Sequence, residues 1–185
     1  MNSPIFQAES RLPLWLNVLA LYAICATLLV AFYYQLWKIE LPCPLCLLQR
    51  GGMLLIGFGF LFNVRFGIRN RHYAMALLGA ITAGAVGMRQ VFLHITPGDA
   101  GYGSPFLGLH FYTWTVVASL LVIVAVALMM TLKEGASREA PHFSLLGKVG
   151  ALLFTALIAA NLVSTVLECG GGQCDDNPTF YQLLR

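Results

Sequence analysis

Five long apolar runs constrain this chain more than any other feature. Each is long enough to cross a bilayer as a helix, and they cover about residues 13–37, 46–64, 73–93, 111–132 and 147–167. Only 10% of the 185 residues are charged and 58% are hydrophobic, which leaves too little polar surface for a water-soluble globule. We therefore expect an all-α membrane protein with five transmembrane helices, organised as a single membrane domain over residues 1–185 with a tail from residue 168.

The first apolar run is predicted to stay in the protein. It is longer than the apolar part of a signal peptide, and no pair of small residues typical of a cleavage site precedes Cys43. Small residues also mark the third run, where Gly79, Ala83 and Gly87 recur every four residues. Such a stripe favours close packing against another helix in a membrane.

Positive charge is unevenly divided between the two sides of the predicted bundle. With five spans, one side would carry seven Lys and Arg residues and the other side two. The first set is Arg11, Arg65, Arg69, Arg71, Lys133, Arg138 and Lys148, and the second set is Lys38 and Arg185. Because short cytoplasmic loops are enriched in positive residues, we expect the N-terminus to be cytoplasmic and the C-terminus to lie on the opposite side.

Two cysteine pairs fall on that non-cytoplasmic side, Cys43 with Cys46 and Cys169 with Cys174. Pro44 suits the first position of a helix, so Cys43 is predicted to cap the second span and Cys46 to lie in its first turn. Arg50 follows Cys46 by one turn. A helix N-terminus and a nearby cation both favour a thiolate, so we interpret the first pair as a redox centre.

Other interpretations of the cysteines stay open on this evidence. The four paired cysteines could bind zinc or form two inert disulfides in a membrane scaffold without turnover, although their spacing is irregular for zinc and an oxidising compartment disfavours thiolate ligands. We expect no metal, and the unpaired Cys25 is predicted to be a packing residue. No basic patch with interleaved aromatic residues suggests a nucleic-acid partner.

Three further polar residues near the non-cytoplasmic side are candidate ligand contacts. Arg50 lies near the outer end of the second span, Arg89 lies in the last turns of the third, and His94 follows it. A charge inside a membrane span is functional by default, but Arg89 could simply anchor a helix end, and His94 could be a surface residue.

The chain resembles the DsbB family of inner-membrane thiol oxidases. The resemblance rests on Cys43-Pro44-Leu45-Cys46 with Gln49-Arg50, on Arg89, and on Phe106-Leu107-Gly108-Leu109 followed by Trp114. It covers about residues 13–132, four of the five predicted spans, which would form a DsbB-like bundle. It implies a bacterial inner-membrane enzyme that reoxidises a periplasmic thioredoxin-like protein of the DsbA type and passes the electrons to ubiquinone or menaquinone.

The resemblance also implies roles for individual residues. Cys43 and Cys46 would be the redox pair beside the quinone, and Arg50, Arg89 and His94 would be candidate quinone contacts. A reductase that runs in the opposite direction, as in vitamin K epoxide reductase relatives, is the alternative enzyme.

The sequence departs from the family pattern in one respect. Family members usually carry a second cysteine pair between the third and fourth spans, whereas residues 94–110 contain no cysteine. A fifth span instead brings Cys169 and Cys174 back to the same predicted periplasmic side. We therefore hypothesise that this tail pair exchanges with the soluble partner.

Overall fold

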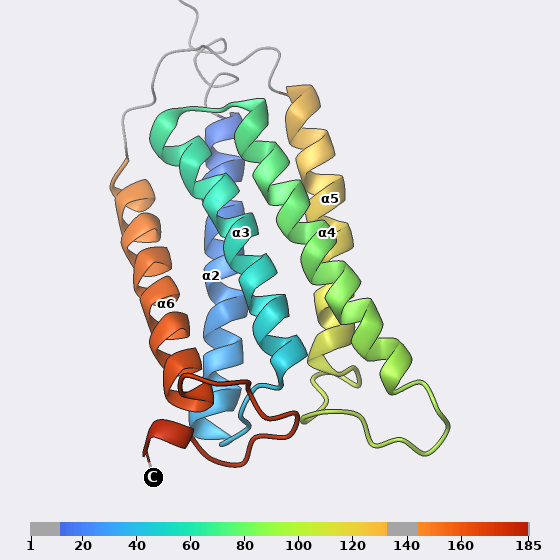
Figure 1. The fold of residues 1–185 in the computed structure, drawn as a ribbon. Coiled ribbons are helices and arrows are strands. Elements are labelled where there is room, and N and C mark those ends of the chain that lie inside the picture. Colours follow the sequence, from blue (N-terminus) through green and yellow to red (C-terminus); the bar gives the residue numbers. More distant parts are fainter. Residues whose placement is uncertain (1–11, 133–143, 185) are drawn as a thin grey trace, which may run out of the picture.

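The computed structural model describes residues 12–132 and 144–184. Within these residues the chain forms five long α-helices, each apolar enough to cross a membrane, and one short 3₁₀ helix (Figure 1). They are α2 (Leu12–Trp37), α3 (Pro44–Phe66), α4 (Asn70–Leu93), α5 (Phe111–Leu132), α6 (Leu145–Cys169) and η2 (Gln182–Leu184). The prediction of an all-α membrane protein with five transmembrane helices is confirmed.

The helices run up and down as a bundle with α3 and α4 at its centre. α3 packs most extensively on α4 and then on α2, whereas α5 packs mainly on α4. α6 lies beside α2 on the flank away from α5 (Figure 1). The loop from α2 to α3, the loop from α4 to α5 and the C-terminal tail all lie at the lower end in Figure 1, so both cysteine pairs share that end.

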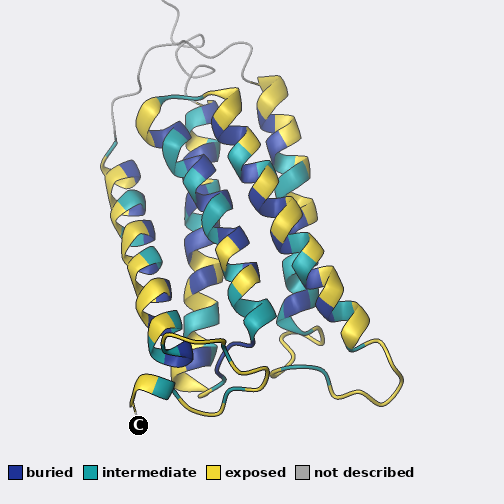
Figure 2. Ribbon diagram, in the orientation of Figure 1, coloured by how far each residue is buried: buried dark blue, intermediate teal, exposed yellow. Residues whose placement is uncertain are grey.

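The distribution of buried and exposed residues fits a membrane bundle. Exposed positions cover the outward faces of all five described helices, and many of these positions are large and apolar (Figure 2). The core is filled by side chains such as Phe60, Tyr73 and Phe154, each at most 1% exposed. Cys25 is a free cysteine inside this core, as expected for a packing residue.

A polar network locks α2, α3 and α4 together at the end opposite the cysteine pairs. The Asn17 amide donates to the Pro13 carbonyl and to the Tyr73 hydroxyl, both at 2.8 Å. The Asn63 amide donates to the Asn17 side-chain oxygen at 2.9 Å, and the Asn63 oxygen accepts from the Arg69 backbone at 3.0 Å. Because lipid offers no hydrogen bonds, buried polar groups of this kind must satisfy one another.

The helix ends differ from the predicted spans at one functionally important point. α6 continues past residue 167 to Cys169, so Glu168 and Cys169 lie in its last turn rather than in the tail. It ends at Gly170, whose φ of 61° is a conformation that glycine adopts readily. Four residues of the charge count lie outside the described residues, namely Arg11, Lys133, Arg138 and Arg185.

Candidate functional site

The first cysteine pair caps α3. Cys43 is the N-cap residue, its sulfur accepts a hydrogen bond from the Cys46 backbone N–H at 3.2 Å, and Pro44 is the first helical residue. The two cysteines form a disulfide with their Cα atoms 5.0 Å apart. Cys43 is buried, whereas Cys46 is partly exposed. The positive end of the α3 dipole therefore lies at the two sulfur atoms, where it favours a thiolate.

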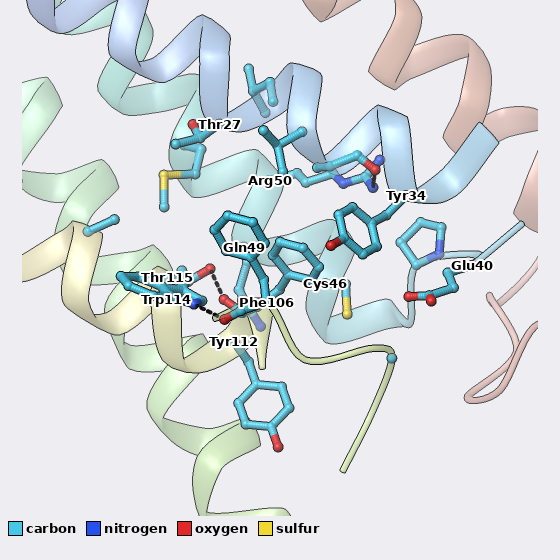
Figure 3. A pocket seen from close by; sticks show the side chains of 18 of the residues that line it. Thr27, Tyr34, Glu40, Cys46, Gln49, Arg50, Phe106, Tyr112, Trp114 and Thr115 are labelled. Atoms are coloured by element: carbon cyan, nitrogen blue, oxygen red, sulfur yellow. Dashed lines mark hydrogen bonds between the residues drawn. The ribbon is translucent and has the colours of Figure 1, made fainter. Parts of the chain in front are cut away.

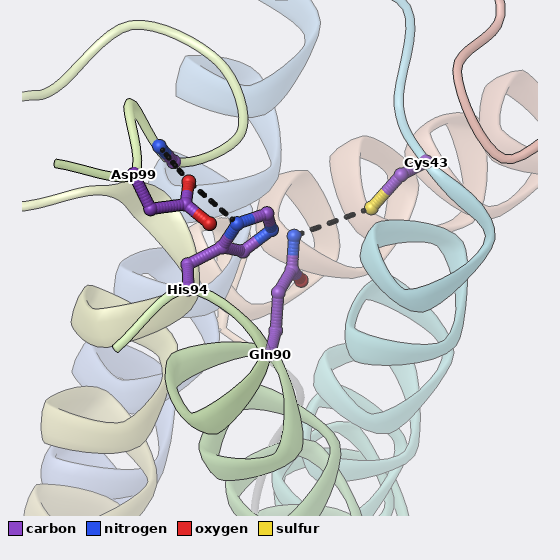
Figure 4. A network of polar contacts seen from close by, with 5 residues as sticks. Cys43, Gln90, His94 and Asp99 are labelled. Carbon is purple, nitrogen blue, oxygen red and sulfur yellow. Dashed lines mark hydrogen bonds and ion pairs between the residues drawn. The ribbon is translucent and has the colours of Figure 1, made fainter. Parts of the chain in front are cut away.

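On the neighbouring helix α4, Gln90 contacts this disulfide. Its Nε2 atom lies 3.4 Å from the Cys43 sulfur (Figure 4) and 3.8 Å from the Cys46 sulfur. Its Oε1 atom accepts from the Gln49 amide at 2.7 Å, which fixes the orientation of the Gln90 amide group. Gln90 was not among the functional residues predicted from the sequence. Its signal was nevertheless present, because Gln90 continues the Gly79, Ala83 and Gly87 stripe one turn further along the same helix face.

Arg50 is held by uncharged groups. Its guanidinium donates to the Gln35 side-chain oxygen at 2.6 Å and to the Ala31 carbonyl at 3.2 Å, and it lies 5.3 Å from the centre of the Phe32 ring. Gln35 is buried and in turn donates to the Ser164 hydroxyl at 2.5 Å and to the Tyr181 hydroxyl at 2.9 Å. Arg50 is thereby connected through Gln35 to both α6 and the tail.

A largely apolar cavity of about 360 Å³ lies beside the disulfide, between α2, α3 and α5. Cys46, Gln49 and Arg50 contribute its polar wall on α3 (Figure 3). The remaining wall is mostly apolar and aromatic, and includes Tyr34, Met53, Phe106, Phe111 and Trp114. A concave apolar site with a few convergent polar groups is the usual form of a small-molecule binding site.

The loop between α4 and α5 closes the outer side of this cavity and is tied to the loop before α3. The Tyr102 hydroxyl donates to the Leu41 carbonyl at 2.6 Å, and the backbone and hydroxyl of Ser104 both donate to the Glu40 carboxylate. Burial, and then the negative charges of Glu168 and Glu40, raise the pKa of Tyr102 to about 12. The phenol is therefore a hydrogen-bond donor at neutral pH.

The Phe106-Leu107-Gly108-Leu109 segment is a tight turn at the cavity wall. Backbone hydrogen bonds of 2.8 and 3.1 Å join Phe106 and Leu109 in both directions, and φ is positive at Leu107 (51°) and Gly108 (82°). The Trp114 indole donates to the Phe106 carbonyl at 2.8 Å (Figure 3). These contacts hold the Phe106 ring against the cavity, so the motif shapes the site without contributing a reactive group.

Arg89 and His94 do not line the cavity. Arg89 is exposed on α4, one residue before the inward-facing Gln90. His94 ends α4, pairs with Asp99 at 3.1 Å (Figure 4), and stacks on Tyr112, which does line the cavity. The Gly101 backbone N–H, and then the His94 ring, lower the pKa of Asp99. Quinone contacts by Arg89 and His94 stay predictions.

The tail cysteines form a second disulfide between Cys169 and Cys174, with their Cα atoms 4.4 Å apart. Cys169 is 4% exposed, whereas Cys174 is more accessible. Cys174 lines a groove together with Pro44 and Leu47 from the first turn of α3. The tail pair therefore lies beside the helix end that carries the first pair. Among the described residues, no cluster of three or more His, Cys, Asp or Glu side chains could hold a metal ion.

The described fold and site define a helical, multi-pass membrane protein whose disulfide adjoins an apolar cavity. Comparison with known families narrows this class. The model of the family described as "Disulfide bond formation protein DsbB" matches residues 13–104, a stretch that covers α2 from its second residue and the whole of α3 and α4. The chain belongs to the DsbB family.

Three relatives, each named Disulfide bond formation protein B, show the extent of the similarity. The protein from Azoarcus sp. is 31% identical over 120 residues, which are 62% of this chain and 70% of the relative. The one from Aromatoleum aromaticum is 27% identical over 153 residues, 63% of this chain and 92% of the relative. The one from Marinobacter nauticus is 43% identical over 84 residues, 42% of this chain and 49% of the relative. The match to the Marinobacter protein thus spans about half of that protein's length. No solved structure matches the chain.

Proposed function

We propose that the protein is a membrane thiol oxidase of the bacterial inner membrane. It would reoxidise a periplasmic thioredoxin-like protein of the DsbA type, pass the electrons to ubiquinone or menaquinone, and so support disulfide bond formation. One observation carries this proposal: Cys46 of the Cys43–Cys46 disulfide lines an apolar cavity, and its neighbours Pro44 and Leu47 line a groove that includes Cys174. The uneven positive charge of the loops supports a periplasmic location for both pairs.

The cavity suits a quinone. Its wall is mostly apolar, as a flat hydrophobic ring requires, and it includes hydrogen-bond donors from Gln49 and Arg50. The hydrogen bonds to Gln35 and Ala31 use two of the five N–H donors of Arg50, which leaves others for a ligand oxygen. A bound quinone would take up the two electrons and two protons that disulfide formation releases.

The accessibility of the sulfur atoms suggests the order of thiol exchange. The thiolate of the reduced partner would attack Cys174, the more accessible tail sulfur, and release Cys169 as a thiolate. The partner's second thiol would then close the partner's disulfide and free Cys174. Cys169 would attack Cys43 and release the Cys46 thiolate towards the cavity, and Cys174 would finally re-form the tail disulfide and leave Cys43 as a thiol. The helix dipole and Arg50 both favour the negative charge on Cys46.

Quinone reduction by the purified protein with a reduced DsbA-type partner tests this scheme. The natural chain should reduce quinone, and the double variant Cys169→Ser plus Cys174→Ser should lose at least about tenfold in rate, because the route from the partner to Cys43 is broken. Cys25→Ala is the matched control, since this cysteine is unpaired and should leave the rate unchanged.

Other outcomes point to other functions. A double variant as fast as the natural chain would mean that the tail disulfide is structural and that the partner meets Cys43–Cys46 directly. Net reduction of the partner by reduced quinone would indicate the reductase that runs in the opposite direction. A chain inert in both directions would support the non-catalytic membrane scaffold.

A further inference from the structure

Glu168 is a buried carboxyl group without a hydrogen-bond partner. Its side chain is 2% exposed, and neither carboxylate oxygen is hydrogen-bonded within the described part of the chain. It lies on the buried face of α6, one turn beyond Ser164 and two beyond Asn161. A carboxylate in such a place loses its hydration without compensation, unless an opposite charge stabilises it or it takes up a proton.

Arg50 is the cation that faces Glu168. The two side chains interact electrostatically, although no hydrogen bond joins them. The hydrogen bonds of Arg50 go to neutral groups, so Glu168 supplies the negative charge in its surroundings. Three other charged or titratable groups surround this pair: Glu40 and Tyr102 from the neighbouring loops, and Tyr181 from the tail. α2 contributes the neutral Gln35.

Reduction of the first disulfide would change this charge balance. In the oxidised state Glu168 is the carboxylate that acts most strongly on Arg50. When Cys46 becomes a thiolate, a second negative charge appears in the same enclosed region, since Cys46 and Arg50 line one cavity. Two like charges that share one cation in a low-dielectric site disfavour each other's ionised forms. Protonation of the carboxyl group would relieve that repulsion and leave Arg50 to the thiolate.

We propose that Glu168 takes up one proton when the Cys43–Cys46 disulfide is reduced and releases it when the disulfide re-forms. The inference rests on the redox role proposed above for this pair. In the reduction, two electrons from a dithiol break the S–S bond. One proton binds the Cys43 sulfur, a second proton binds a Glu168 oxygen, and Cys46 stays a thiolate beside Arg50. The net charge of the site is then the same in both states.

The equilibrium between the purified full-length protein and dithiothreitol tests this proton balance. Dithiothreitol releases two protons on oxidation and the natural site, with Glu168 ionised before reduction, would take up two, so the exchange constant for Cys43–Cys46 should not change between about pH 7.5 and about pH 8.5. In Glu168→Gln the site takes up only one proton, and the constant should rise about tenfold per pH unit. The state of Cys43 and Cys46 is read by alkylation and peptide mass spectrometry, separately from Cys169 and Cys174.

Matched variants distinguish an effect of the Glu168 proton from an effect of the shape of the Glu168 side chain. Glu168→Asp keeps a carboxyl group and should keep the pH-independent constant. Asp175→Asn removes an exposed carboxylate of the same tail and should also keep it. A constant that rises tenfold per pH unit in the natural chain as well would overturn the proposal, because the Glu168 proton would then not follow the redox state.

An infrared difference spectrum of the natural chain provides a second test that does not depend on the folding of Glu168→Gln. Reduction should produce the carbonyl band of a protonated carboxylic acid, and Asp175→Asn should retain it. A reduced-minus-oxidised spectrum without that band would refute proton uptake. These results also distinguish the inference about Glu168 from the proposed oxidase function. The oxidase function fails if Cys43–Cys46 cannot be reduced or does not support quinone reduction. The inference about Glu168 fails if the pair reacts but Glu168 takes up no proton.

Discussion

At the scale of single residues, two neighbours on α4 show how the direction in which a side chain faces determines what it contacts. Arg89 carries the charge that attracts attention in a membrane span, yet it is exposed on the bundle surface. Gln90 is uncharged, 2% exposed, and in contact with both sulfurs of the Cys43–Cys46 disulfide. Successive residues on a helix point about 100° apart. The direction that each side chain faces, rather than its charge, therefore determines whether it contacts the disulfide.

Gln90→Leu should make the first disulfide harder to reduce. The Gln90 N–H can donate to a thiolate, and a hydrogen bond to a charged group stabilises it by about 1.5–3 kcal/mol. The equilibrium constant for reduction by dithiothreitol should therefore fall by about tenfold or more. Arg89→Leu is the neighbouring control and should change the constant by less than about twofold, because its side chain lies away from the sulfurs. Equal constants for Gln90→Leu and the natural chain would mean that this contact does not tune the pair.

At the scale of helices, the closest approach in the bundle is between α3 and α4. A Cβ atom added at Gly79 would lie 2.7 Å from the Gly52 carbonyl oxygen and 2.7 Å from the Ile56 nitrogen. Backbone atoms cannot yield as a flexible side chain can, so glycine is required at this crossing. The same crossing sets how near Gln90 comes to the first turn of α3.

Gly79→Ala should destabilise the bundle by about 1–3 kcal/mol, because the added methyl group forces the two helices apart. Gly51→Ala is the matched control in the facing helix. Nothing lies within 4 Å of a Cβ atom at Gly51, so alanine should be neutral there or stabilise α3 by up to about 1 kcal/mol. Unfolding in a denaturing detergent measures both changes. Equal loss of stability in the two variants would contradict the close-crossing argument.

The sequence predicted helices and caps better than it predicted their polar contacts. Cys43 at the N-cap and Pro44 at the first helical position follow from local chemistry, and both predictions are confirmed. Glu168 was expected in the tail, because hydropathy ends a span at the first charge, whereas the helix continues to Cys169. The Gln35 contacts with Arg50, Ser164 and Tyr181 join residues up to 146 positions apart, and no local pattern specifies such pairs.

At the scale of the whole molecule, five spans bring both cysteine pairs to one end of the bundle. Counting spans predicted that the two cysteine pairs share a face, and the structure has both at the same end (Figure 1). The position of α6 against α2 could not be predicted, because each span has apolar residues on several faces. The loop from α4 to α5 completes the assembly through its contacts with the loop before α3.

The hydrogen bond from the Tyr102 hydroxyl to the Leu41 carbonyl, which joins these loops, should be lost in strong alkali. The pKa of Tyr102 is raised to about 12 by burial and by Glu168 and Glu40. A raised pKa means that the folded state holds the proton more tightly, so the stabilisation is complete below the unfolded value of about 10 and is lost as pH rises through about 12. An absorbance titration should show a late tyrosinate component that is smaller in Tyr102→Phe and unchanged in Tyr33→Phe. A late component of undiminished size in Tyr102→Phe would rule out this assignment.

The part of the cavity wall that lies on α2 affects how a substrate would reach the site. Ala26, Thr27 and Val30 line the cavity and are exposed on the apolar flank of α2, so the site meets the hydrocarbon layer rather than water. A substrate dissolved in lipid would reach it by lateral diffusion in two dimensions. The quantity that sets its supply is then the mole fraction of that substrate among the lipids. Adding phospholipid at constant amounts of protein and quinone would slow turnover by dilution within the membrane, even though the concentrations of protein and quinone per unit volume of the sample are unchanged.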